Sequence, residues 1–126
     1  MNAINLSVSL TVKDLNTSLA WYTDVLGFTV NQKHERNGTL RAVSLSAGSA
    51  QILITQDDGA KGSDRAKGEG FSFMMTTAEN VDELAARAKA AGATLDSEPA
   101  DGFGRRAFRL RDPDGFRLAI STERRR

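Results

Sequence analysis

The stretch LSVSLTVKDLNTSLAWYTDVLGF, residues 6–28, sets the pattern from which the fold is predicted. Residues 6–12 alternate apolar and polar side chains, which is typical of a strand with one buried face. A helix is predicted to follow, with Asp14 or Asn16 as its N-terminal cap and Gly27 at its end. The apolar side of this helix comprises Leu15, Leu19, Tyr22 and Leu26.

Three further strands complete the first unit, which spans residues 4–57. The pair Asn37-Gly38 is the residue pair most typical of a tight hairpin, and Ala47-Gly48 supplies a second turn. The strands are predicted over residues 28–35, 40–45 and 51–55. The resulting order is strand, helix and then three strands.

The same order is predicted again over residues 70–122, after a glycine- and charge-rich linker over 58–69. Asn80, followed three residues later by Glu83, is typical of a helix N-terminus, and Gly92 ends the helix. The buried stripe of this helix comprises Val81, Leu84, Ala85, Ala88 and Ala91. Strands are predicted over 71–75, 94–97, 105–111 and 116–121, with a loop through 99–104 and a type I turn at 112–115.

The composition fits one soluble domain. The chain has 126 residues, 40% of them hydrophobic and 26% charged, and a formal net charge of +1, which favours neither nucleic acid nor a membrane surface as a partner. It shows neither a long apolar span nor a secretory signal, so we expect it in the cytoplasm. The absence of cysteine excludes disulfides and thiolate metal sites. The basic triplet Arg124-Arg125-Arg126 is interpreted as a solvated end.

Three groups of residues carry a family resemblance. They are Val12-Lys13-Asp14-Leu15 with Trp21-Tyr22 and Leu26-Gly27-Phe28; Val81-Asp82-Glu83-Leu84 with Ala90-Ala91-Gly92-Ala93; and Gly104-Arg105-Arg106-Ala107-Phe108 with Asp112-Pro113-Asp114-Gly115. In this order they resemble the vicinal-oxygen-chelate superfamily of glyoxalases, bleomycin-resistance proteins and extradiol dioxygenases. The resemblance implies an α+β fold of two tandem βαβββ units, forming a curved eight-stranded mixed sheet (a cup) with the helices on its convex side. It also implies a homodimer.

The metal positions that the resemblance implies carry no suitable side chains. Metal-dependent members take His, Glu or Gln ligands from the first and last strand of each unit, because these side chains offer lone pairs to divalent cations. The positions fall on Ser7, Leu53 (or its neighbour Ile52), Gly70 and Ala119. We therefore predict a member of the superfamily that has lost its metal ligands and uses no cofactor.

The single histidine, His34, is predicted to lie on the surface. The Asn37-Gly38 hairpin places it opposite Arg41, on the same face as Val43 and pointing out of the cup. One histidine in a chain without cysteine cannot by itself assemble a nitrogen or sulfur metal site.

Side-chain alternation predicts which residues line the concave face. Pairing through the 112–115 turn places Phe108 opposite Ala119 and Arg106 opposite Ser121, with Arg117 on the same face. The predicted ligand-binding residues are Ser7, Ser9, Gln51, Leu53, Ser72, Met74, Phe103, Arg106, Phe108, Arg117 and Ala119. These residues would form apolar walls with small hydroxyls and one or two guanidinium groups, which is typical of a small-molecule site.

Two of these assignments have open alternatives. Arg106 and Arg117 favour an anionic or aromatic ligand, or they lie at a wet rim and pair with Glu35 or with acids of the linker. Phe103 lies between two glycines on the predicted loop. It either folds over a ligand as a lid or simply packs.

The leading functional hypothesis is a metal-independent small-molecule-binding protein that sequesters an antibiotic or a metabolite. The alternative is a glyoxalase- or dioxygenase-like enzyme, a lyase, isomerase or oxygenase with an atypical site or one completed by a second subunit. Rim residues Glu35 and Lys33 are the available bases for an enzyme without a metal.

Overall fold

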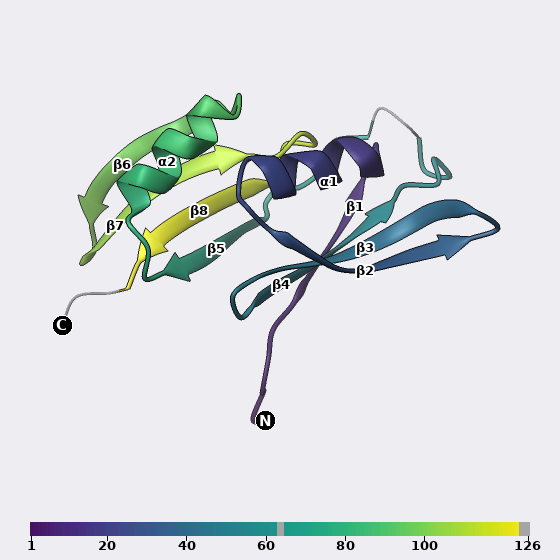
Figure 1. The fold of residues 1–126 in the computed structure, drawn as a ribbon, viewed down its shortest axis with the longest axis horizontal. Coiled ribbons are helices and arrows are strands. Elements are labelled where there is room, and N and C mark those ends of the chain that lie inside the picture. The colour runs from purple at the N-terminus through teal and green to yellow at the C-terminus, as the bar shows by residue number, and fades with distance from the viewer. Residues whose placement is uncertain (63–64, 124–126) are drawn as a thin grey trace. The chain divides into compact units, whose positions relative to one another are not determined.

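A computed structural model of the protein describes residues 1–62 and 65–123. The chain forms two compact units, Met1–Arg65 and Ala66–Arg126. The elements of unit 1 are β1 (Val8–Val12), α1 (Leu15–Asp24), β2 (Thr29–Arg36), β3 (Thr39–Ala47) and β4 (Ala50–Gln56). Those of unit 2 are β5 (Ser72–Thr77), α2 (Val81–Ala90), β6 (Leu95–Gly102), β7 (Arg105–Arg111) and β8 (Arg117–Thr122) (Figure 1).

The predicted α+β fold of two tandem βαβββ units is confirmed. Hydrogen bonding divides the eight strands between two four-stranded mixed sheets, ordered β1-β4-β3-β2 in unit 1 and β5-β8-β7-β6 in unit 2. In each sheet the first strand of the unit pairs in parallel with its last strand, and the other pairs are antiparallel. The basic triplet at 124–126 lies outside the described residues.

Unit 1 buries one face of its sheet against α1, which contacts β3 and β4. Burial of these side chains removes apolar surface from water and is the main force holding the unit together. Of the predicted helix face, Leu15 and Tyr22 are buried, and Leu19 and Leu26 are half-buried. The buried sheet residues are Leu10, Val12, Val43, Leu45, Ile52 and Ile54.

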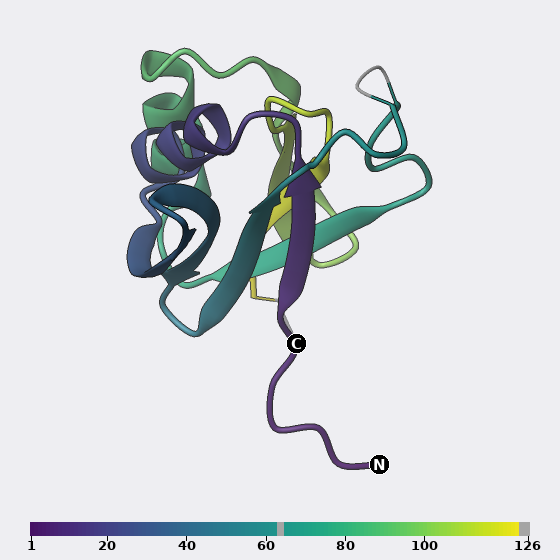
Figure 2. The same cartoon turned by 90° about the vertical axis from the view of Figure 1, so that its right-hand side faces the viewer.

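The first strand is shorter than predicted. The alternating pattern begins at Leu6, but β1 begins at Val8, and Leu6 is exposed. Residues 1–7 precede β1 and continue outward from its N-terminal end (Figure 2). Within this segment, Asn5 Nδ2 donates a hydrogen bond to Gln51 Oε1 over 3.3 Å. Neither helix of the described residues is long and apolar enough to cross a membrane.

The helix termini follow the predicted capping chemistry. Asp14, rather than Asn16, caps α1: its carboxylate accepts from the backbone N–H groups of Asn16 and Thr17. The side chain of Asn80 accepts from the backbone N–H of Glu83 over 3.1 Å at the start of α2. Such caps satisfy backbone donors that have no partner within the helix.

Unit 2 is built in the same way, with α2 in contact with β6, β7 and β8. The predicted stripe of α2 is confirmed at Val81, Ala85 and Ala88, and Leu84 is half-buried. Ala91 is exposed, because it is the C-terminal cap of the helix and not part of its last buried turn. The buried sheet residues on the side of α2 are Phe73, Phe108, Leu110, Leu118 and Ile120; Ala119 and Ser121 of β8 are also buried, on the opposite side of the sheet.

The predicted loop through 99–104 is wrong. β6 continues to Gly102, and Phe103-Gly104 forms a tight turn into β7. β6 is an edge strand, and the ladder is irregular between Ser97 and Ala100, so Pro99 is accommodated there despite its missing N–H.

The two units differ in the chemistry of their tight hairpins. Asn37 and Gly38 join β2 to β3 with φ values of 54° and 76°, and Phe103 and Gly104 join β6 to β7 with φ values of 51° and 75°. Asparagine tolerates this left-handed backbone, whereas a bulky side chain rarely adopts it. Phe103 is also 97% exposed, so burial does not offset the strain.

We therefore expect Phe103→Asn to stabilise the protein by about 1 kcal/mol, because it removes backbone strain without removing a buried contact. Urea unfolding measures the change. The matched variant Asn37→Phe introduces the same strain in unit 1 and should destabilise by a similar amount. Equal stabilities of Phe103→Asn and wild type would contradict the assigned turn.

Candidate functional site

The sheet of unit 2 has one face packed on α2 and one face opposite it. Residues of β5, β7 and β8 alternate between the two faces. Phe73, Leu110 and Leu118 lie on the helix-packed face and are buried. We call the opposite side the open face of unit 2; its residues include Ser72, Met74, Arg109, Arg111, Arg117 and Ala119.

A depression of about 290 Å³ lies at one end of this sheet. It combines an aromatic ring, a hydroxyl, a carboxylate and two guanidinium groups. Its lining comprises Gly70, Phe71, Ser72, Asp96, Arg109, Leu110, Arg117, Leu118 and Ala119. The volume is at the lower end of the range for small-molecule sites, so the depression suits a small ligand or one part of a larger ligand.

The charges of the open face are unbalanced. Arg111 Nε donates to Asp96 Oδ2 at 2.9 Å. Arg109 and Arg117 form no ion pair with any residue that the structure describes. Of the three guanidinium groups at or beside the depression, only that of Arg111 is paired with a described carboxylate, which leaves an excess of positive charge there.

Arg111 and Arg117 are direct cross-strand partners. The backbone N–H of Asp112 donates to the carbonyl oxygen of Phe116 over 3.0 Å. Because hydrogen-bonded and non-hydrogen-bonded pairs alternate, Arg111–Arg117 is a non-hydrogen-bonded pair, in which side chains approach most closely. Like charges placed opposite each other in this way destabilise a sheet.

The predicted pairing of β7 with β8 is off by one residue. Phe108 pairs with Ile120, not Ala119, and Ser121 pairs with Ala107, not Arg106. The prediction assumed a two-residue turn, but three residues, Pro113 to Gly115, separate the paired Asp112 and Phe116. Gly115 has a φ of 93°, which is typical of a type I turn followed by a left-handed residue.

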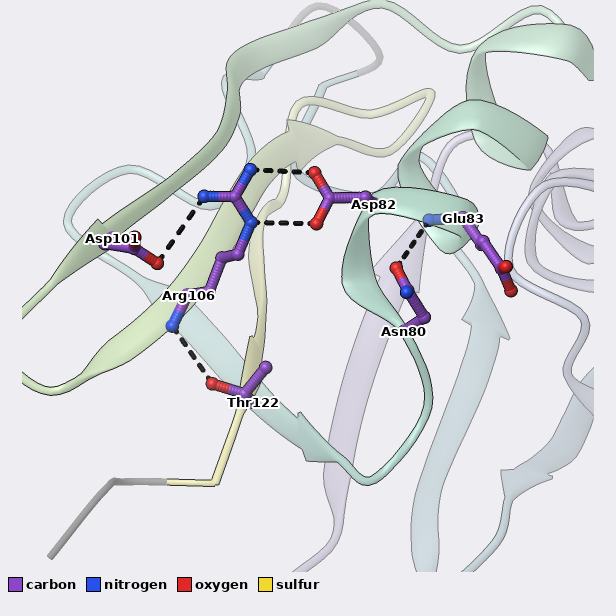
Figure 3. A network of polar contacts seen from close by, with 6 residues as sticks. All are labelled: Asn80, Asp82, Glu83, Asp101, Arg106 and Thr122. Carbon is purple, nitrogen blue, oxygen red and sulfur yellow. Dashed lines mark hydrogen bonds and ion pairs between the residues drawn. The ribbon is translucent and has the colours of Figure 1, made fainter.

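This shift removes Phe108 and Arg106 from the open face. Phe108 is fully buried in the core beside α2. The guanidinium of Arg106 forms two hydrogen bonds of 2.8 Å to the carboxylate of Asp82 in α2 and one of 3.4 Å to Asp101 (Figure 3). Arg106 therefore links the helix to the sheet, with partners other than Glu35 or the linker acids.

The ion pair between Arg106 and Asp82 also shifts the pKa of both groups. The hydrogen bonds from Arg106 lower the pKa of the Asp82 carboxyl below its ordinary value, and Asp82 raises the pKa of Arg106. Both side chains are partly exposed, so water screens their attraction. Arg106 acts as a structural residue here.

Three of the predicted binding residues do line the depression: Ser72, Arg117 and Ala119. Met74 lies next to them on the open face, paired with Ala119 and 59% exposed. The other six lining residues were not predicted as binding residues: Gly70, Phe71, Asp96, Arg109, Leu110 and Leu118. Arg109 was missed because of the register error; counting the turn as three residues would have placed it opposite Ala119.

Phe103 does not reach this depression. It lies at the far end of β7, six residues from Arg109. At about 3.4 Å per residue of strand, this separation is roughly 20 Å. A role for Phe103 as a lid over this site is therefore not supported.

The predicted residues of unit 1 lie on the sheet face opposite α1. Ser9 pairs with Leu53, and their neighbours Thr11 and Thr55 approach to 3.3 Å through their hydroxyl oxygens. Ser7 precedes β1, and Gln51 lies at the start of β4. Ser7, Ser9 and Gln51 are exposed and Leu53 is half-buried, so this face is neutral and hydroxyl-rich.

The placement of His34 differs from the prediction. His34 pairs with Ala42 instead of Arg41 and shares its face with Gln32 and Ser44, not with Val43. A register shift between His34 and Glu35 causes the change, because one extra residue turns all following side chains to the other face. His34 remains exposed, as predicted.

Comparison with known proteins identifies the family. The Glyoxalase/Bleomycin resistance protein/Dioxygenase superfamily matches residues 5–120. The chain belongs to this superfamily. No curated protein matches the chain significantly.

Several solved structures share the fold of this chain. A glyoxylase/bleomycin resistance protein/dioxygenase domain from Frankia sp. EAN1pec is 24% identical, with a TM-score of 0.78 over 98% of this chain and 94% of that chain. TnmS3, an antibiotic binding protein from Streptomyces sp. CB03234, is 16% identical, with a TM-score of 0.76 over 97% and 98%. An integron cassette protein from V. cholerae is 22% identical, with a TM-score of 0.74 over 97% of both chains. At these identities the likeness shows the fold alone.

The residues at the four positions that the family resemblance implies for a metal carry no side chain that fits a divalent ion. Leu53 and Ala119 offer only hydrocarbon, Gly70 has no side chain, and Ser7 carries a hydroxyl. Divalent cations in such sites require imidazole or carboxylate ligands. Residues 1–62 and 65–123 contain no group of three or more His, Asp or Glu side chains placed to hold a metal ion.

The excess positive charge of the open face generates a stability prediction. We expect Arg117→Gln to raise the free energy of unfolding by about 0.5 kcal/mol at low salt, because it removes the like charge opposite Arg111. The gain should shrink at high ionic strength, where charges are screened. Chemical unfolding at two salt concentrations measures it, with Arg41→Gln on the exposed part of β3 as the control. A gain that is absent, or that does not depend on salt, would refute the repulsion.

Proposed function

We propose that this chain is a small-molecule-binding protein that needs no metal ion, and that the depression on the open face of unit 2 is its binding site. The observation that carries the proposal is the make-up of that depression. The Phe71 ring, the Ser72 hydroxyl and the guanidinium groups of Arg109 and Arg117 line one concave surface. Apolar surface with a few polar groups is the usual composition of a ligand site.

A solved structure with the same fold supports this proposal, because TnmS3 is described as an antibiotic binding protein. Sequestration of an antibiotic or a metabolite is accordingly the specific form of binding that we propose. The cytoplasm and a homodimer remain the expected location and assembly.

The enzyme alternative has less support from the site. The one carboxylate that lines the depression, Asp96, is already engaged by Arg111, whose Nε donates to it over 2.9 Å. No histidine lines the depression as the described residues form it. A glyoxalase- or dioxygenase-like reaction would therefore need groups from a second subunit.

The proposal predicts that some small aromatic or peptide-like compound stabilises the protein. A ligand present at about ten times its Kd should raise the free energy of unfolding by about 1.4 kcal/mol, which corresponds to a rise of roughly 5 °C in Tm. Thermal melts against a panel of antibiotics and metabolites measure the effect.

Two variants localise the binding. Ser72→Phe fills the depression from an exposed position on β5 and should abolish the stabilisation by a hit compound. Thr76→Phe adds the same ring to an exposed position on the same strand and face, four residues away, and should retain it. The proposal fails if no compound raises Tm, or if both variants respond like wild type.

A further inference from the structure

The two unpaired arginines of the depression point to the chemistry of its ligand. Arg109 and Arg117 lie on adjacent strands and the same face, two residues apart in register, because Arg109 pairs with Ala119. Diagonal neighbours of this kind are about 7–8 Å apart at Cα, within the reach of long side chains. Both arginines line the depression, and neither forms an ion pair with a described residue.

The residues that the structure describes do not neutralise this cluster. The one carboxylate of the lining, Asp96, is held by Arg111, which stands directly opposite Arg117. The remaining positive charge is a cost to the folded protein that an added anion would relieve. A guanidinium group presents paired N–H donors that match the two oxygens of a carboxylate or phosphate.

Next to the cluster, the depression offers an apolar surface. The side chain of Phe71 is 41% exposed and packs on Phe73 with a centroid separation of 6.1 Å. Met74 extends the apolar surface on the same face of β5. Aromatic rings and methionine sulfur both make favourable contacts with a planar ring.

We infer that the ligand carries an oxyanion, a carboxylate or a phosphate, attached to an aromatic ring. The oxyanion binds between Arg109 and Arg117, and the ring lies against Phe71. This inference rests on the proposed function, since it specifies what the depression binds. The volume of about 290 Å³ accommodates a single substituted ring, or the acidic ring of a larger compound.

The test uses benzoate and phenyl phosphate as probes, with benzyl alcohol as the neutral compound of the same ring and inorganic phosphate as the anion without a ring. Binding to the full chain is measured by calorimetry or by NMR titration at constant ionic strength. We expect benzoate or phenyl phosphate to bind at least about tenfold more tightly than either control, because benzyl alcohol lacks the charge-assisted pair and inorganic phosphate lacks the contact of a ring with Phe71.

The variants separate this site from general electrostatic attraction. Arg109→Gln and Arg117→Gln should each lower the affinity for the aromatic anion by about tenfold. Arg41→Gln, which removes the same charge from the exposed surface of β3, should leave the affinity unchanged. Preference for phenyl phosphate over benzoate, or the reverse, identifies which oxyanion the site takes.

Three results overturn the inference. If benzyl alcohol binds as tightly as benzoate, or if Arg41→Gln weakens binding as much as Arg117→Gln, the arginines do not recognise an oxyanion, while binding in the depression stands. If neither aromatic anion binds at millimolar concentration, the inference is also wrong. The proposed function stands in that case if the compound panel yields a ligand whose binding Ser72→Phe abolishes. It fails as well if the panel yields no such ligand.

Discussion

The carboxylate of Asp112 fixes the geometry on which the open face of unit 2 depends. It is almost fully buried and accepts from the backbone N–H groups of Asp114 and Phe116, each at 2.9 Å. These bonds close a three-residue connection that ends with Gly115 in a left-handed conformation. Because side chains alternate along a strand, the length of this turn decides which alternate residues of β7 face the core.

The length of that turn decides which residues of β7 belong to the candidate site. With Asp112 paired to Phe116, Phe108 enters the core, and Arg109 lies on the open face beside Ala119. A turn shorter by one residue would bury a guanidinium group and expose a phenylalanine. Burying an unpaired charge is far more costly than any contact on this surface, so the register is strongly specified.

The sequence predicts the fold well because its signals are local. Alternation in β1, the cap at Asp14 and the Asn37-Gly38 turn depend on neighbours within a few residues, and all three are confirmed. The errors in strand register arise where one extra residue enters a ladder, after His34 and at Gly115. No periodicity reveals such an insertion, yet it moves His34 and Arg109 to the opposite face.

The two units share one architecture and differ in the chemistry of their open faces. In unit 1, Leu53 on the last strand has two cross-strand partners, Ser9 and Ser44, and the three residues form one row across the sheet. The corresponding row of unit 2 consists of Met74, Ala119 and Arg109. Neither row carries an imidazole or carboxylate, and unit 2 alone gathers arginines. The two open faces therefore present different chemistry on the same scaffold, hydroxyl groups in unit 1 and guanidinium groups in unit 2.

The register of β7 against β8 is open to a direct measurement, because the chain contains no cysteine. In the double variant Arg109→Cys with Ala119→Cys, the two thiols occupy a non-hydrogen-bonded pair and should form a disulfide on mild oxidation, detected by mass spectrometry. Phe108→Cys with Ala119→Cys places them on opposite faces, so no intramolecular disulfide should form. Cross-linking of the second pair but not the first would remove Arg109 from the open face and contradict the account of the site.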